Sequence, residues 1–306
     1  MIIVLSVCLG LIIINPAASI TAARNASLVW AQTVMPSLFP YMVLTQLLTG
    51  HIRKRGFADK FALPVTVLLG MLGGSPSGAK LLANHFSLRI GNHGLGGVNS
   101  NASRRALQSA SAMVTTASPM FMIASLPAML GGTAAYDGVR IFAAHMLANI
   151  VAGGVCYLSV RIMRQKDERT EIAPIVKGRE APSVDSFFEI IRNSATSMLA
   201  VCGAMIIFGV LTSGLLSIMS LPDYVAATIA SVLEMAGGCA KIATLPLATP
   251  PRAALMCAAA TFGGMSIFVQ NAAYLQTARV NMKVQFAAKI LAGIMAFGLT
   301  MMFYLL

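Results

Sequence analysis

The chain has 306 residues, of which 57% are apolar and 10% are charged, and its formal net charge is +12. Soluble domains carry about 25% charged residues, so this composition excludes an ordinary soluble protein. Several apolar runs reach about 20 residues, which is enough for a helix to cross about 30 Å of hydrocarbon. A transmembrane barrel has alternating segments of about 10 residues instead. We therefore predict a polytopic, all-α membrane protein.

The charged and metal-binding residue types exclude several functions. The basic residues are dispersed among short loops, where membrane proteins keep them for topological reasons, and this argues against nucleic-acid binding. The five cysteines lie in apolar segments without CxxC spacing, and the four histidines form no HxxxH or HExxH pattern. These patterns favour buried cysteines, and they predict no metal, no cofactor and no enzymatic activity.

Nine apolar segments are expected to form helices. They fall at residues 2–22, 28–50, 61–85, 106–131, 139–162, 187–219, 223–248, 250–275 and 284–306. The first has the apolar core of a signal peptide but lacks a basic start, which favours a retained helix. The segment 187–219 is overlong, and its first part, SFFEIIRNS, is expected to lie on the membrane surface as an amphipathic stretch.

The basic loops indicate which segments fold back. Basic residues cluster at 51–60, 86–105, 161–185 and 279–289, the last group being Arg279, Lys283 and Lys289. If segment 61–85 crossed the membrane, one of its two basic flanks would lie outside, against the positive-inside tendency. We therefore expect re-entrant hairpins with tips at GGSPSG and, in segment 223–248, at EMAGGCAK. This topology places the N-terminus inside and the C-terminus outside.

The two halves of the chain carry similar motifs in the same order. GSPSGAKLLA is similar to MAGGCAKIAT, and AMVTTASPMFMIAS is similar to AATFGGMSIFVQNA. In the expected topology these are inverted repeats, which bind substrates near the membrane midplane between broken helices. Chance similarity among Gly-rich apolar sequences is the alternative. The expected organisation is an N-terminal transmembrane helix (1–26), a first repeat (27–164), a cytoplasmic linker (165–185) and an inverted second repeat (186–306).

Two Gly- and Pro-rich stretches interrupt the apolar runs. GGSPSGAK has the Gly73 to Gly78 spacing of a phosphate-binding loop, but Ala79 displaces the lysine and Leu81 replaces the hydroxyl residue. No strand precedes it, so nucleotide hydrolysis is not expected. The two prolines of MPSLFP, at 35–40, are expected to kink a helix for architectural reasons.

Lys80 and Lys241 occupy matching positions of the two repeats, inside apolar segments. An ammonium group within the hydrocarbon is costly, and such residues mark ion or substrate pathways. Snorkelling to the membrane surface is the structural alternative. We predict that the two lysines bind the charges of a dicarboxylate, assisted by backbone N–H groups at helix starts and by Ser75 and Ser77.

Other candidate residues lie near the breaks in the helices. Ser118, Ser266, Gln270 and Asn271 are candidate substrate ligands, because polar groups at this depth need a partner. Hydrogen bonds between helices are the alternative for each of them. Glu234 is the acid that lies well inside an apolar segment, and it is a candidate for coupling transport to H⁺ or Na⁺. A buried ion pair is the alternative role for this carboxylate.

Four motifs resemble those of a known family. They are WAQTVMPSLFPYMVLTQLL, GGSPSGAKLLA, LEMAGGCAKI and FGGMSIFVQ, and in this order they resemble the sporulation integral membrane proteins of the YlbJ type, in the nucleoside-recognition (Gate) domain superfamily. The resemblance runs from about residue 28 to the C-terminus. It implies a bacterial inner-membrane protein of spore formers, which moves dipicolinic acid toward the developing spore across the cytoplasmic membrane or the mother-cell-derived membrane around it. It also implies kinship with concentrative nucleoside transporters, which carry paired re-entrant hairpins.

The expected function is secondary transport of a small organic anion by alternating access. Dipicolinic acid, a rigid dianion, agrees with the two-lysine site. The expected partners are this substrate, a coupling H⁺ or Na⁺ and the lipid bilayer. A nucleoside transporter, using Glu234, Gln270 and Asn271, is one alternative. The other is a membrane scaffold of a sporulation assembly, which transports nothing.

Overall fold

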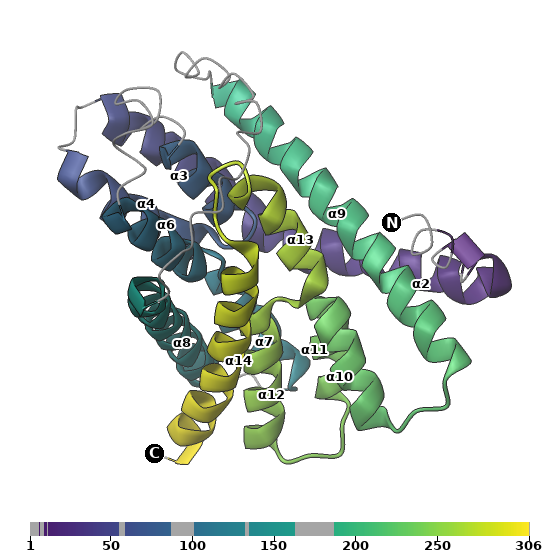
Figure 1. Cartoon of the computed structure of the whole chain (residues 1–306). Coiled ribbons are helices and arrows are strands. Elements are labelled where there is room, and N and C mark those ends of the chain that lie inside the picture. Colours follow the sequence, from purple (N-terminus) through teal and green to yellow (C-terminus); the bar gives the residue numbers. More distant parts are fainter. Residues whose placement is uncertain are drawn as a thin grey trace.

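The structure is a computed structural model that describes residues 6, 9–10, 12–54, 59–86, 101–131, 135–162 and 187–305. All regular elements in these ranges are helices, as Figure 1 shows, so the all-α prediction is confirmed. The expected linker 165–185 lies outside the described residues, as does most of the expected first segment.

After Asn15, one helical run continues without a gap from Pro16 to Lys54. It comprises α2 (Pro16–Val29), the π-helical turn η1 (Trp30–Val34) and α3 (Met35–Lys54). Asn15 caps its start, since Oδ1 accepts the N–H of Ala18 at 3.2 Å and a proline follows. The helix boundary expected between residues 22 and 28 is therefore wrong. The break lies at Asn15 instead.

Each π-helical turn ends two residues before a proline. The turn η1 ends at Val34, two residues before Pro36, and η2 (Phe121–Ser125) ends two residues before Pro127. Proline lacks an N–H and its ring crowds the preceding turn, and a π-turn is a local helix defect that accommodates both effects. The expected disturbance at MPSLFP therefore takes the form of a π-turn, and α3 continues through Pro40.

The first hairpin consists of α4 (Asp59–Gly73) and the helical residues 77–86, joined by the expected turn at Gly74. Gly74 has a φ of 68°, in the left-handed region that favours glycine. A Cβ on Gly78 would lie 2.3 Å from the carbonyl oxygen of Val114 and 2.7 Å from that of Gly70. The small residues of this motif therefore permit close backbone packing.

The second hairpin consists of α10 (Asp223–Leu233) and α11 (Met235–Ala243). Glu234 lies between them in extended conformation, with φ −141° and ψ 120°. A Cβ on Gly238 would lie 2.3 Å from the Cα of Ser231, so glycine again allows the two helices to touch. The chain thus turns at both of the expected tips.

Each hairpin is followed by a broken helix. We define the first break as the unwound residues 115–118, between α6 (Asn101–Val114) and the helical run of η2 and α7 (Leu126–Met129). The second break is Gly263, between α12 (Thr249–Phe262) and α13 (Gly264–Leu275). Gly263 and Gly264 have φ values of 88° and 71°, so the second break depends on glycine.

Long helices enclose these elements. They are α8 (Ala135–Ile162), α9 (Phe187–Ile218) and α14 (Met282–Leu305). Figure 1 shows α8, α14 and α12 on one side of the molecule and α9, packed along α2, on the other. Alanines form much of the contact between α8, α12 and α14, including Ala148, Ala253 and Ala296, which are fully buried. Small side chains bring membrane helices into close contact.

Within the described residues, four helical stretches are long and apolar enough to cross a membrane. They are Asp137–Ser159, Phe187–Ile218, Thr249–Leu275 and Met282–Leu305. The first helices of the two hairpins are apolar but shorter, at Phe61–Gly73 and Asp223–Leu233. The described residues 187–194 of the expected surface stretch instead begin α9, one uninterrupted helix of 32 residues, or about 48 Å at 1.5 Å per residue.

The packing of the second hairpin leads to a stability prediction. Gly238→Ala should lower the thermal unfolding midpoint of the detergent-purified protein, because its Cβ would meet backbone atoms that cannot turn away; such overpacking costs about 1–3 kcal/mol. Gly298→Ala in α14 is the matched control, since nothing lies within 4 Å of its Cβ. It should be neutral or slightly stabilising through helix propensity. Equal midpoints for the two variants would contradict the close packing of α10 on α11.

Candidate functional site

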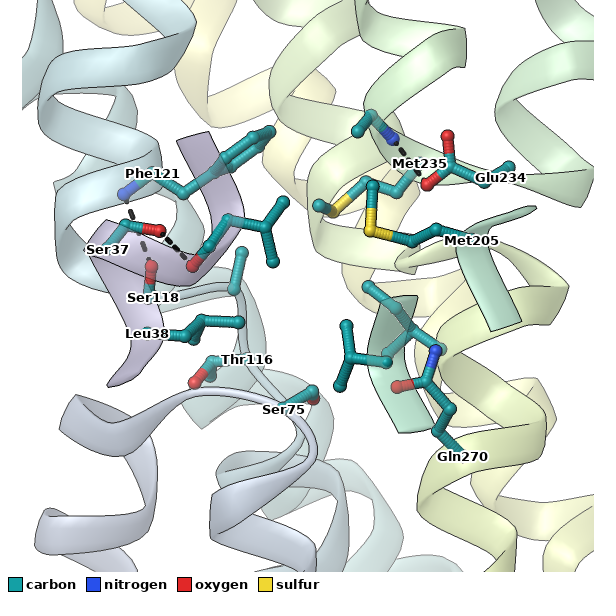
Figure 2. A pocket seen from close by; sticks show the side chains of 15 residues that line it. Ser37, Leu38, Ser75, Thr116, Ser118, Phe121, Met205, Glu234, Met235 and Gln270 are labelled. Atoms are coloured by element: carbon teal, nitrogen blue, oxygen red, sulfur yellow. Dashed lines mark hydrogen bonds between the residues drawn. The ribbon is translucent and has the colours of Figure 1, made fainter. Parts of the chain in front are cut away.

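A cavity lies between the two hairpin tips (Figure 2). The first tip contributes Ser75, the first break contributes Thr116 and Ser118, and the second tip contributes Glu234. Gln270 of α13 completes the polar part of the wall, together with Ser37 of α3. The space between atoms is about 490 Å³ when the open solvent at the mouth is counted.

The first hairpin tip is bonded directly to the first break. The N–H of Ser75 donates to the carbonyl oxygen of Thr116 at 2.7 Å, and Thr116 Oγ1 donates to the carbonyl oxygen of Met71 at 2.9 Å. Ser118 Oγ accepts the N–H of Phe121 at 3.2 Å, at the start of η2. Backbone groups left free by the break are thereby satisfied, and hydroxyl groups are held at the cavity wall.

Glu234 supplies a carboxylate at the opposite wall, as Figure 2 shows. Its Oε1 accepts the N–H of Ala236 at 3.0 Å, and its Oε2 accepts the N–H of Gly237 at 2.6 Å. These N–H groups begin α11, where the helix leaves them without intrahelical partners and where its dipole favours negative charge. The carboxylate, which is only 8% exposed, is thus stabilised by the start of a helix.

The rest of the lining is apolar. Phe121, Met205 and Met235 face the polar groups, and α9 also contributes Val201. Among the described lining residues none is lysine or arginine. The cavity therefore offers hydroxyl groups, one amide and one capped carboxylate within an apolar wall.

The structure does not bring the two predicted lysines together at this cavity. Lys80 lines a smaller neighbouring cavity with Ser77 and Gln46, and its Nζ lies 3.5 Å from Ser197 Oγ of α9. Lys241 is exposed in the last turn of α11. A shared substrate site for these two lysines stays a prediction.

The predicted serines and amides fall into two groups. Ser75, Ser118 and Gln270 line the larger cavity, whereas the hydroxyl of Ser77 donates to the carbonyl oxygens of its own hairpin turn. Ser266 is buried behind the wall and accepts from Gln270 Nε2 at 3.3 Å.

Asn271 connects the two halves of the chain. It is 4% exposed, and its Nδ2 donates to Ser75 Oγ at 3.2 Å. The first hairpin tip is thereby linked to the helix that follows the second break. Asn271 Oδ1 has no hydrogen-bond partner among the described residues.

Sequence reasoning missed a buried polar cluster beside the first break. Lys289, expected with the cytoplasmic loop charges, is instead 4% exposed within α14. Its Nζ donates to the carbonyl oxygen of Thr115 at 2.6 Å and to Asn149 Oδ1 at 2.8 Å. His145 and Gln285 complete the cluster. A sequence signal existed, because each of the apolar helices α8 and α14 carries two polar residues four positions apart, on one face.

Comparison with known proteins gives one relative. No protein-family model matches the chain. No solved structure matches it either. The chain is similar to the sporulation integral membrane protein YlbJ of Bacillus subtilis (strain 168), with 24% identity over 331 aligned positions that cover 93% of this chain and 77% of the relative. This similarity confirms the family resemblance that the motifs indicated: over most of its length the chain is similar to an integral membrane protein of the sporulation YlbJ type.

Proposed function

We propose that this protein is a secondary transporter of a small organic anion and that the cavity in Figure 2 is its substrate site. The observation that supports this proposal is the meeting of both hairpin tips and the first break around one cavity. Irregular backbone at membrane depth is tolerated where it is buried in protein or lines a cavity. In transporters, such broken elements build the substrate site between two repeats.

The two halves share one local arrangement, which supports an inverted repeat. In the first half, the hairpin tip contacts the break through the hydrogen bond from Ser75 to Thr116. In the second half, a Cβ on Gly264 would lie 3.1 Å from the backbone nitrogen of Met235, so tip and break are again in contact. Rocking of one such unit against the other would open the cavity to alternate sides of the membrane.

A dicarboxylate such as dipicolinic acid is the substrate that we propose. The N–H groups of Ala236 and Gly237 are a ready anion site, which Glu234 occupies in this structure. A substrate carboxylate can take this place when Glu234 is protonated or moves away. Lys80, on the helix that follows the first tip, is the predicted cation on the first hairpin. In this proposal the protein acts without enzymatic chemistry, in the bacterial cytoplasmic membrane or the membrane around the forespore.

Nucleoside transport is the second candidate, and a specific observation favours it. Glu234 and Gln270 line the cavity together with the hydroxyls of Ser75 and Ser118. A carboxylate and an amide can form hydrogen bonds with ribose hydroxyls and with the edges of nucleobases. The predicted kinship with the nucleoside-recognition superfamily points the same way. A scaffold that transports nothing is the third candidate.

Flux in proteoliposomes tests the three candidates. We expect uptake of labelled dipicolinate, with weak competition by excess uridine. Ala117→Phe places a large ring in the cavity and should reduce uptake roughly tenfold or more, because a blocked site loses its contacts to the substrate. Ala200→Phe, on an exposed position of α9, is the matched control. Uridine uptake without dipicolinate uptake would favour the nucleoside candidate, and absence of any flux would favour the scaffold.

The predicted roles of the lysines can be separated by substitution. Lys80→Ala should raise the KM for dipicolinate several-fold, because its ammonium lies beside the first hairpin tip. Lys241→Ala should leave uptake unchanged, since this side chain is exposed at the end of α11. Wild-type kinetics in both variants would contradict anion binding by either lysine.

Coupling through Glu234 has its own test. Glu234→Gln keeps an oxygen that accepts from the start of α11 but removes the charge, so uptake should lose part of its dependence on the H⁺ or Na⁺ gradient. Asp223→Asn, at an exposed position in the first turn of α10, is the control. If uptake and ion dependence are unchanged in Glu234→Gln, Glu234 does not carry the coupling ion.

A further inference from the structure

Lys289 is a buried cation held by neutral oxygens. Its partners are the main-chain carbonyl of Thr115, at the first break, and the side-chain amide oxygen of Asn149 in α8. A buried ammonium group without charged partners is costly unless its N–H groups are well bonded. The distances of 2.6 and 2.8 Å are those of strong, charge-assisted hydrogen bonds. The unwound carbonyl is therefore a cation ligand.

The neighbouring residues hold the rest of the break in place. Gln285 Nε2 donates to Thr115 Oγ1 at 2.9 Å and to the carbonyl oxygen of Ser111 at 3.2 Å. The N–H of Ala117 donates to His145 Nε2 at 3.2 Å. Helices α8 and α14 thus bind both the carbonyl and the N–H groups that the first break exposes, as the lack of water at this depth requires.

His145 is neutral in this arrangement. Its Nε2 accepts an N–H and so carries no proton. Thr261 Oγ1 donates its one hydrogen to the carbonyl oxygen of Cys257 at 2.7 Å. In its 2.8 Å contact with His145 Nδ1 the hydroxyl must therefore accept, and Nδ1–H is the donor. The ammonium of Lys289 is therefore the positive charge of this cluster.

Carbonyl and amide oxygens around one positive charge, at an unwound stretch of a membrane helix, are the ligands of a coupling ion in transporters with broken helices. We propose that Thr115 O and Asn149 Oδ1 form a monovalent-cation site and that Lys289 fills it with a tethered ammonium. The ion bound at the first break is then a proton carried by Lys289, in the place that Na⁺ would otherwise take. The consequence for coupling rests on the proposed transport function, whereas the cation site itself does not.

Few other charged groups face this site. In the described parts of the packed helices, the titratable side chains in contact with the cluster are His145 and Cys257. The remaining ones lie five or more positions along their helices from Thr115, His145, Asn149, Thr261 and Lys289, about 7.5 Å or more at 1.5 Å per residue; they are Arg104, Arg105, Asp137, Arg140, Cys156, Tyr157, Arg252, Lys283 and Tyr304. Lys283, two positions from Gln285, is exposed. Protonation of Lys289 is therefore the main local source of charge at this break.

Two substitutions test the cation site without a transport assay. Lys289→Met keeps most of the volume but removes the cation, and it should reduce the folded yield and the thermal unfolding midpoint of the purified protein. Lys289→Ala should lower the folded yield and the unfolding midpoint in the same way. Methylammonium chloride, present from extraction onward, should restore part of the lost yield and midpoint of this variant. Choline chloride at equal concentration is the control, because its cation is too large for the site. Lys283→Met, at an exposed position of α14, is the control variant and should match wild type.

Each outcome decides the proposal. Wild-type yield and midpoint in Lys289→Met would overturn it, as would a Lys289→Ala variant that responds equally to both salts or to neither. A restoration specific to methylammonium supports a site for a small monovalent cation.

Transport measurements test the coupling consequence separately. Dipicolinate uptake by the wild-type protein should follow a pH gradient and should not change when choline replaces Na⁺, and Lys289→Met should lose the dependence on pH. Uptake that requires Na⁺ and ignores the pH gradient would overturn the assignment of the proton as coupling ion. If neither dipicolinate nor uridine is transported, the proposed function fails, while the yields and midpoints still decide the cation site.

Discussion

The architecture depends on one constraint: a helix that is broken at membrane depth must find partners for the backbone groups that it exposes. Water cannot supply them there. At the first break the carbonyl of Thr115 is bonded by Lys289, the carbonyl of Thr116 by the first hairpin tip, and the N–H of Ala117 by His145. The hairpin, α8 and α14 therefore need to pack where they do for the break to persist.

The second half satisfies the same constraint by different chemistry. Gly263 and Gly264 adopt left-handed conformations, and the second hairpin tip packs closely on Gly264, where a Cβ would lie 3.1 Å from the backbone nitrogen of Met235. The exposed N–H groups belong to the start of α11, and the carboxylate of Glu234 accepts their hydrogen bonds. The first half thus stabilises exposed carbonyl oxygen with a cation, and the second stabilises exposed N–H groups with an anion. Each charge suits the backbone dipole beside it.

Much of this organisation was predictable because it depends on local residue chemistry. Gly74 and Gly263 mark a turn and a break directly, and Pro36 and Pro127 follow the two π-helical turns, whereas α3 continues through Pro40. The two-lysine site was less accessible to sequence reasoning, because equal positions in two motifs do not fix which way a side chain faces, and Lys241 is exposed. Lys289 lies close to a basic loop in sequence, and its burial follows from the packing of α14 on α8, which one sequence does not specify.

The first break has two faces, and this geometry links the candidate site to the buried cluster. The side chains of Thr116 and Ser118 line the cavity, whereas the backbone groups of Thr115 and Ala117 are held from behind by α14 and α8. Four consecutive residues thus form both part of the cavity wall and the ligand of a buried charge. A movement that releases either face must displace the other. If protonation of Lys289 changes the affinity for a substrate by some factor, substrate binding must change the proton affinity of Lys289 by the same factor. This follows because coupling between two binding equilibria is reciprocal.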